Sequence, residues 1–336
     1  MIRQFVTCVI LLVCVQTLVA EDQTSRSAFE INKTLAKTVN MGNMLEPPYE
    51  GAWGLTLKES YFPIIAEAGF TAVRIPVSWG YHTAKEEPYQ IEPEFMARVK
   101  RAVQAALDAK LSVVLNIHHD PSINEHPEES WPRLRAMWSQ IGREFADAPD
   151  TLVLELLNEP HDQLNAERWL KMIPDLLAIV RESNPKRVLM VGGPNWNSIS
   201  DLPKLKLPEN DTQIIATFHY YLPFEFTHQG AEWSSEHVRN IRREWTGTAE
   251  EKEAIDKHFK LAAEWGKANH RPLFLGEFGA YSKADQPSRI RWTKAIVETA
   301  KKYEISWAYW EFAAGFGIYD PQAETWKVDL RDALLK

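Results

Sequence analysis

Cysteine is scarce in this 336-residue chain, because Cys8 and Cys14 are the only two and both lie within the first 20 residues. That opening segment carries a positive Arg3 followed by an almost wholly apolar run, which is typical of a secretory signal and short for a membrane span. We therefore predict a signal peptide at 1–20 and one folded domain at 21–336. Cleavage would leave no thiol, which excludes disulfides and cysteine-ligated zinc from the mature chain.

Positive charge and further long apolar runs are also lacking. The formal net charge is −8, so no basic stripe is available to bind nucleic acid or an anionic membrane. No second apolar stretch is long enough to span a bilayer, so we expect no membrane association after signal cleavage. The expected product is a secreted monomer located outside the cell, at the cell surface or in the periplasm.

What the chain does contain is a regular alternation of apolar strand candidates and amphipathic helix candidates. The eight strand candidates are 39–41, 71–77, 112–117, 152–157, 188–191, 214–218, 273–276 and 306–309. Most are apolar on both faces, as expected for a parallel sheet covered by helices. No glycine-rich turn follows the first strand, so an open doubly wound sheet is disfavoured. We predict an α/β fold, a single TIM (β/α)8 barrel.

Polar or aromatic residues lie in or directly after seven of these eight strands. They are Asn43, Glu46, Arg74, His118, His119, Asn158, Glu159, His219, Tyr221, Glu277 and Trp310. The active site of a TIM barrel lies at the carboxyl ends of its strands. These side chains are therefore predicted to meet at one mouth of the barrel.

Two glutamates carry the chemistry that this arrangement implies. Glu159 lies in TLVLELLNEPH (151–161) and Glu277 in PLFLGEFGAY (272–281), each after an apolar strand run. Either one alone is equally explained as a polar residue where a strand meets a loop. Glycoside hydrolysis needs one carboxylic acid to protonate the leaving oxygen and one carboxylate to attack or to activate water. Two carboxylates at one barrel mouth therefore favour a glycosidase.

Metal and cofactor chemistry are disfavoured. His118 and His119 are adjacent, and side chains of adjacent residues on an extended strand point to opposite faces, so we do not expect them to share one ion. A catalytic zinc also needs three protein ligands, and we predict no metal. No lysine ends a predicted strand and no glycine pattern matches a phosphate loop, so we predict no cofactor. An inactive carbohydrate-binding protein is the other class to consider, although the presence of both glutamates argues against it.

The chain resembles glycoside hydrolase family 5, the family of cellulases and mannanases, over residues 36–334. The motifs that carry the resemblance are GNMLE (42–46), VRIPVSW (73–79), NIHHD (116–120), LNEPH (157–161), FHYYLPFEFTHQGAEW (218–233), GEFGAY (276–281) and WAYWEF (307–312). Two of them, at 218–233 and 276–281, look especially like compact bacterial endo-β-1,4-glucanases of this family, some of which also cleave mannan.

The resemblance implies a retaining mechanism with Glu159 as acid/base and Glu277 as nucleophile. Arg74 and the hydroxyl of Tyr221 would favour the ionised form of Glu277, and His219 would orient Glu159. Burial and the charge of Glu277 would keep Glu159 protonated at the start of the reaction.

The remaining predicted positions concern the sugar. Asn158 would donate to the sugar 2-hydroxyl, and Trp310, followed by a cis peptide bond, would form a stacking platform. Asn43, Glu46 and the two histidines are predicted to support substrate binding. Four further tryptophans are candidates for lining an extended groove: Trp53, Trp79, Trp196 and Trp233. We expect an endo-β-1,4-glucanase acting on β-1,4-glucan, with an endo-mannanase, a dual enzyme or an exo-acting glucosidase as alternatives.

Overall fold

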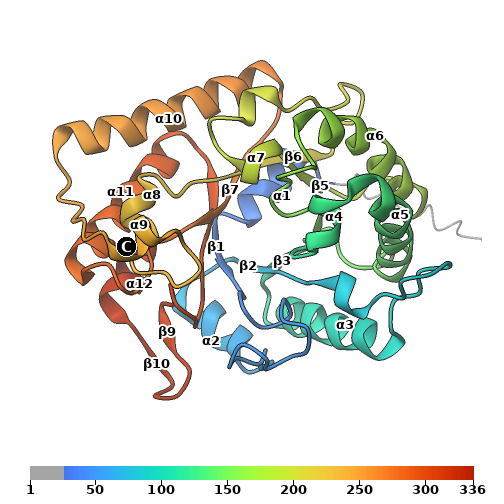
Figure 1. Ribbon diagram of the computed structural model, residues 1–336, viewed down its shortest axis with the longest axis horizontal. Helices are drawn as coiled ribbons and strands as arrows, with labels where there is room; N and C mark the ends of the chain where they lie inside the picture. The colour runs from blue at the N-terminus through green and yellow to red at the C-terminus, as the bar shows by residue number, and fades with distance from the viewer. Residues whose placement is uncertain (1–25) are drawn as a thin grey trace, which may run out of the picture.

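The computed structural model describes residues 26–336, so the predicted signal segment at 1–20 lies outside the described residues. In the described part, eight parallel strands close into a barrel in chain order, and the last strand pairs with the first (Figure 1). The strands are β1 (Lys37–Asn40), β2 (Ala72–Ile75), β3 (Ser112–Asn116), β4 (Leu152–Glu155), β5 (Leu189–Gly192), β6 (Ile214–His219), β7 (Leu273–Phe278) and β8 (Ser306–Tyr309). The predicted TIM barrel is confirmed.

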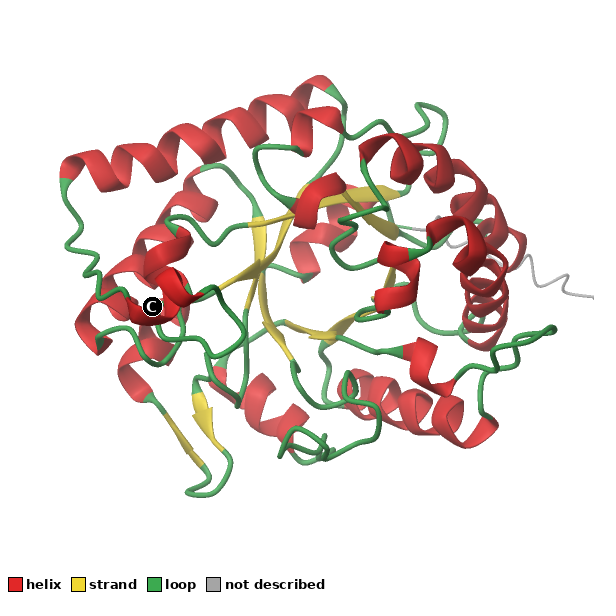
Figure 2. Ribbon diagram, viewed as in Figure 1, coloured by secondary structure: helices red, strands yellow, loops and turns green. Residues whose placement is uncertain are grey.

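Helices surround the barrel on its outer side (Figure 2). The longer ones are α2 (Tyr61–Ala68), α3 (Pro93–Asp108), α5 (Pro127–Glu144), α6 (Ala166–Ser183), α10 (Ala249–Ala268), α11 (Gln286–Lys302) and α12 (Val328–Leu335). The shorter elements are α1 (Ala28–Thr34), η1 (Trp79–His82), α4 (Pro121–Glu125), α7 (Pro194–Asn197), η2 (Leu202–Lys204), α8 (Phe224–Thr227), α9 (Glu236–Asn240) and the hairpin β9 (Tyr319–Asp320) with β10 (Thr325–Trp326). No helix within residues 26–336 is both long and apolar enough to cross a membrane.

Local sequence signals set several of these boundaries. α10 begins with a capping box, in which the Thr248 hydroxyl accepts from the Glu251 backbone and the Glu251 carboxylate accepts from the Thr248 backbone. α3 has Pro93 at its first position, where a missing N–H has no consequence. α2 ends at Gly69, whose φ of 103° is readily adopted by glycine. These local rules fix the lengths of the helices that separate the strands.

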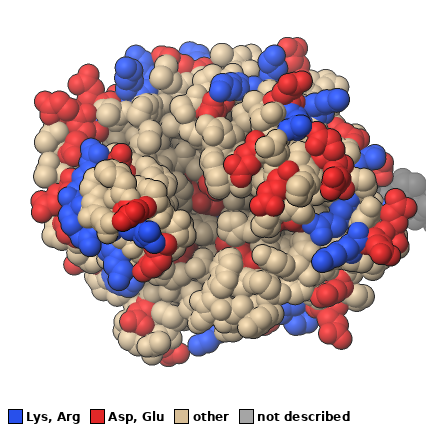
Figure 3. Space-filling view, in the orientation of Figure 1, with Lys and Arg blue, Asp and Glu red and all other residues tan. Residues whose placement is uncertain are grey.

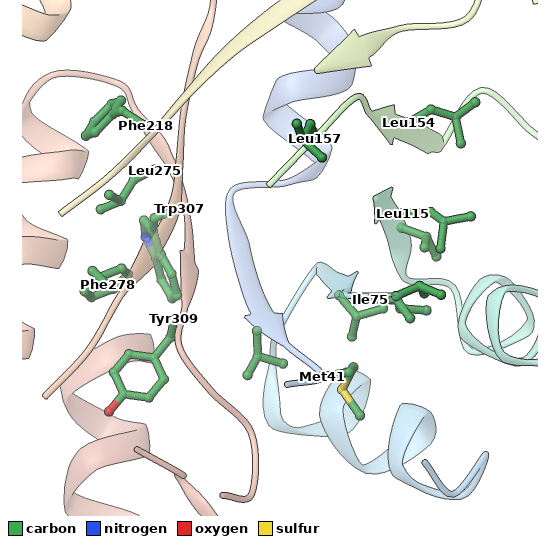
Figure 4. Packing of buried hydrophobic residues seen from close by; sticks show 14 of the residues in the cluster. Met41, Ile75, Leu115, Leu154, Leu157, Phe218, Leu275, Phe278, Trp307 and Tyr309 are labelled. Carbon is green, nitrogen blue, oxygen red and sulfur yellow. The ribbon is translucent and has the colours of Figure 1, made fainter. Parts of the chain in front are cut away.

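The strands divide their side chains between two apolar cores. One set, including Ile75, Leu115 and Leu154, packs outward between the sheet and the helices (Figure 4). The alternating set includes Ala72, Val114, Val153, Met190 and Ile215, and clusters inside the barrel with residues of α1. Because successive side chains on a strand point to opposite faces, the inward set also supplies the residues at the mouth.

Candidate active site

The predicted site residues come from separate strand ends. Arg74 is on β2, His219 ends β6 and Glu277 is the next-to-last residue of β7, while the others lie on loops that follow β1, β3, β4, β6 and β8. The space-filling view shows this face hollowed near its centre, with acidic side chains at the bottom of the hollow (Figure 3).

A fully buried guanidinium forms the floor of the site. Arg74 donates through Nε and Nη2 to Glu155 at 2.6 and 3.0 Å. Its Nη1 donates to Asn40 at 2.9 Å and to Glu277 at 2.7 Å, and its Nη2 donates to Asn158 at 2.7 Å. One side chain therefore fixes both the candidate nucleophile and the asparagine beside the candidate acid.

Glu277 is held by donors on both of its oxygens. Arg74 donates to Oε1, and the Tyr221 hydroxyl donates to Oε2 at 2.9 Å, as predicted for a carboxylate kept in its ionised form. Burial raises the pKa of Glu277 above its usual value, while the nearby His219 and Arg74 oppose that rise. These two donors fix both oxygens of the carboxylate.

Glu159 has a different environment. It lies four residues beyond the end of β4, and its φ of 47° places it in the left-handed region, as is common at functional sites. Its Oε1 is 2.6 Å from His219 Nδ1, and its backbone carbonyl accepts from His161 Nδ1 at 2.5 Å. Burial raises the pKa of Glu159 to about 7, so this carboxyl is protonated below that pH and still partly protonated in neutral solution. Burial, rather than the charge of Glu277, is the largest cause.

The two carboxyl groups face each other across the mouth. One oxygen of Glu159 and one of Glu277 lie within 4.8 Å of each other, with His219 Nδ1 2.6 Å from the first and 3.7 Å from the second. Burial lowers the pKa of His219 to about 4, so its ring is neutral. Retaining glycosidases place their carboxyl groups about 5–5.5 Å apart, whereas inverting enzymes need about 6.5–9.5 Å. The separation fits the retaining geometry.

Glu46 and the two histidines correct one argument made from the sequence. Nε2 of His118 and Nε2 of His119 both face Glu46 Oε1, at 3.6 and 3.8 Å. The expectation that the imidazoles point apart was wrong, because β3 ends at Asn116 and the irregular backbone that follows does not alternate. A second set of possible ligand atoms comprises Glu159, His219 and Glu277. The absence of a metal stays a prediction.

Further contacts order the Glu46 side of the site. Glu46 is fully buried, and its Oε2 accepts from the backbone amide of Asn43. Burial raises the pKa of Glu46 well above its usual range and lowers that of His118 well below its own. The ring of His118 lies parallel to that of Trp310, with centroids 5.6 Å apart. A flat aromatic face thus borders a cluster of buried polar groups.

Trp310 follows β8, and the bond to Glu311 is cis, as predicted. Its backbone approaches Gly279, where an added Cβ would lie 2.1 Å from the Trp310 carbonyl oxygen. Its ring lies against Gly42, where an added Cβ would be 3.1 Å from the indole. Two glycines therefore make room for this tryptophan.

The four tryptophans predicted to line a groove differ in their exposure to solvent. Trp53, Trp196 and Trp233 are exposed by 46%, 50% and 64%. Trp196 stacks on His161 with centroids 3.5 Å apart. Trp79 is fully buried and donates to the carbonyl of Asn116, so its prediction as a groove residue was wrong. Three of the four remain available to a ligand.

Sequence reasoning missed three buried polar residues that organise the floor: Asn40, Asn116 and Glu155. A signal was present, because Glu155 interrupts the apolar run LVLEL and a charge inside such a run requires a partner. The partner, Arg74, lies two strands away and could not be identified by spacing alone.

A closed (β/α)8 barrel with two facing carboxyl groups, one paired with an arginine and one with its pKa raised to about 7, defines a barrel glycosidase. The family model "Cellulase (glycosyl hydrolase family 5)" matches residues 34–315. The chain belongs to glycoside hydrolase family 5, and the predicted family is confirmed.

Named relatives agree with this assignment. The chain is 34% identical to Endoglucanase H of Acetivibrio thermocellus over 313 residues, which is 91% of this chain and 33% of that protein. It therefore spans about a third of that relative's length. It is 44% identical to endoglucanase Cel5A of the hyperthermophilic Thermotoga maritima, with a TM-score of 0.90, covering 92% of this chain and all of that one. A Cel5A structure in complex with mannotriose matches with the same identity and TM-score, covering 91% of this chain and 99% of that one.

Proposed function

We propose that this chain is a retaining endo-β-1,4-glucanase, with Glu277 as nucleophile and Glu159 as acid/base. The observation that carries the proposal is the facing pair of carboxyl oxygens within 4.8 Å, one bound by Arg74 and Tyr221 and the other with its pKa raised to about 7. This asymmetry matches the two roles that the reaction requires.

The reaction takes place in two steps. A Glu277 oxygen attacks the anomeric carbon while the proton of Glu159 passes to the leaving glycosidic oxygen, which gives a glycosyl ester on Glu277 and a free sugar hydroxyl. Glu159, now a carboxylate, then takes a proton from water, whose oxygen attacks the anomeric carbon and releases Glu277. Arg74 stays in contact with Glu277 and stabilises its charge when it departs.

An extended binding site favours attack within a polymer. Trp53, Trp196 and Trp233 are exposed and come from three different loops. Aromatic rings stack on the apolar faces of sugars, so each added sugar contributes binding remote from the cleaved bond. Relatives named endoglucanase support the same choice of substrate.

Azide rescue tests the assignment of the two carboxyls. With an activated aryl β-glycoside, azide should restore turnover of Glu277→Gly and give the inverted α-glycosyl azide, while Glu159→Ala should give the retained β-product. The uncharged variants Glu277→Gln and Glu159→Gln serve as folding controls. The opposite product pattern would exchange the roles, and near-normal activity of either variant would end the proposal.

A comparison of substrates tests whether the enzyme prefers glucan and attacks within the polymer. The endo-glucanase should lower the viscosity of barley β-glucan early, before much reducing sugar appears, and should cut cellotetraose faster than cellobiose. A mannanase or dual activity is the second candidate, because Cel5A of T. maritima was solved with mannotriose. Mannan and glucomannan therefore belong in the same assay. Glucose release with unchanged viscosity would instead identify an exo-acting glucosidase, and no sugar release at all would identify a binding protein.

Export is part of the proposal. The apolar composition of residues 1–20 supports a secreted protein that acts outside the cell, at its surface or in the periplasm. Amino-terminal sequencing of the exported protein should begin near Glu21, and gel filtration should give the mass of a monomer. An amino terminus at Met1 would remove this part of the proposal.

A further inference from the structure

Asn116 connects the floor of the site to His118 through three polar contacts. It is fully buried at the end of β3. Its Oδ1 accepts from the Val77 backbone amide at 3.3 Å, and its Nδ2 donates to Glu155 Oε2 at 3.3 Å. The same Nδ2 is 3.1 Å from His118 Nδ1.

These neighbours fix the orientation of the Asn116 amide. The Val77 amide can only donate, and both oxygens of Glu155 accept from Arg74. Turning the amide over would set two donors against each other at Val77 and two acceptors against each other at Glu155. Asn116 therefore presents an N–H to His118, and a ring nitrogen that accepts a hydrogen bond carries no proton.

We infer that Asn116 is a positioning residue that holds His118 as the Nε2–H tautomer, so that His118 is a donor toward the substrate. Burial keeps the ring neutral, so the ring carries a single proton. With Nδ1 occupied as an acceptor, the proton is on Nε2, which faces Glu46 Oε1 at 3.6 Å and Glu277 Oε1 at 4.0 Å.

The resulting pair has the polarity that a sugar hydroxyl requires. The gap between His118 Nε2 and Glu46 Oε1 is too long for a direct hydrogen bond, and that oxygen has no hydrogen-bond partner among the described residues. A hydroxyl both accepts and donates, so its oxygen can receive the His118 proton, while its own proton can go to Glu46 when that carboxyl is ionised. The other tautomer would offer the hydroxyl only a lone pair at His118. This role rests on the proposed function, whereas the tautomer itself does not.

The same proton position affects metal binding by this cluster. A metal ion needs a lone pair on Nε2, and histidine ligands normally donate their other N–H to an acceptor. Asn116 presents a donor there instead. The arrangement thus suits a hydroxyl and disfavours an ion.

The tautomer can be measured directly on the wild-type enzyme. Nitrogen-labelled histidine and two-bond proton–nitrogen correlation spectra distinguish a protonated Nδ1 from a protonated Nε2. His118→Gln identifies the His118 signals by their loss. We expect a protonated Nε2 and a bare Nδ1 across neutral pH. A protonated Nδ1 would overturn the inference without any further variant.

Asn116→Asp tests the cause, because it replaces the donor that faces Nδ1 with an acceptor. The proton should move to Nδ1, and kcat/KM on β-glucan should fall by about tenfold to a hundredfold. Asn184→Asp is the matched control. Asn184 is a buried asparagine at the end of α6 that donates to Gly142 and accepts from Arg187, so both the His118 tautomer and kcat/KM should match wild type.

The outcomes separate this inference from the proposed function. A proton that stays on Nε2 in folded Asn116→Asp, or one that moves without loss of kcat/KM, would overturn the inference. A wild-type enzyme with protonated Nε2 but no activity on any glucan would support the tautomer and overturn the proposed function. Thermal unfolding of the aspartate variant is measured first, because the new carboxyl lies beside Glu155.

Discussion

The two halves of the barrel interior differ sharply, although the same strands build both. On β2 and β4, Ala72 and Val153 pack into the apolar cluster closed by α1. Two residues further along, Arg74 and Glu155 form a buried ion pair. Burying charges costs free energy that only close partners offset, and Arg74 has hydrogen bonds from all three of its nitrogens. The apolar half supports the fold, and the polar half supports chemistry at some cost in stability.

Substituting the matched positions on β4 should give the largest contrast. Glu155→Leu leaves Arg74 without its main partner, so the free energy of unfolding should drop by about 3 kcal/mol and kcat/KM should fall steeply. Val153→Ala removes apolar contacts, so it should lose about 1–3 kcal/mol of stability with kcat/KM unchanged. Urea unfolding and β-glucan kinetics measure both quantities. Equal effects of the two variants on kcat/KM would remove the division between the halves.

A smaller effect should appear in the way the free energy of unfolding depends on pH. The pKa of Glu159 is raised to about 7 in the folded state, compared with about 4.3 in an unfolded chain. Between these values the folded state holds the extra proton, so this group makes stability fall as pH rises, and its effect is constant above about pH 7. The wild type therefore loses stability relative to Glu159→Gln as pH rises through this range, by the few kcal/mol that this pKa difference is worth.

The pH dependence of kcat/KM should also reflect the ionisation of Glu159. Wild-type kcat/KM should decline as pH rises through about 7, because Glu159 then loses the proton that it must donate. The stability difference between Val153→Ala and wild type should not depend on pH, since no titrating group changes. A pH-independent difference for Glu159→Gln would show that its pKa is not raised.

The smallest expected effect concerns Trp310. Gly42→Ala places a methyl group 3.1 Å from the indole, so the ring must shift by a few tenths of an ångström. We expect a loss of kcat/KM of about threefold to tenfold with little change in stability, as for other small displacements of a binding group. Gly193→Ala is the control, because its nearest neighbour would be 3.6 Å away. A normal kcat/KM for Gly42→Ala would show that the platform tolerates movement.

The sequence predicted the barrel well because its strands are short apolar runs separated by helices with clear start signals. The predicted strand 306–309 has the bounds of β8, and the capping box of Thr248 and Glu251 is a clear start signal for α10. Residues at strand ends could also be identified, because the topology brings all eight ends together.

The errors share a physical cause: a linear pattern does not give the direction of a side chain once regular structure ends. The alternation of a strand does not extend to His118 and His119, because the strand stops at Asn116, and both imidazoles turn toward Glu46. Trp79 sits just beyond β2 as a groove residue would, yet it faces the core. Partners such as Glu155 and Arg74 lie on different strands, so only the three-dimensional register brings them together.

The four carboxylate and amide partners of Arg74 share one planar group, and this makes their energies inseparable. Moving the guanidinium to suit a change at Asn40 or Glu155 also moves the groups at Glu277 and Asn158. Substitutions at residues that share a partner are not additive, and the interaction energy between them can have either sign. A substitution at any one of these positions should therefore be judged together with the other three, because all four act on the same guanidinium.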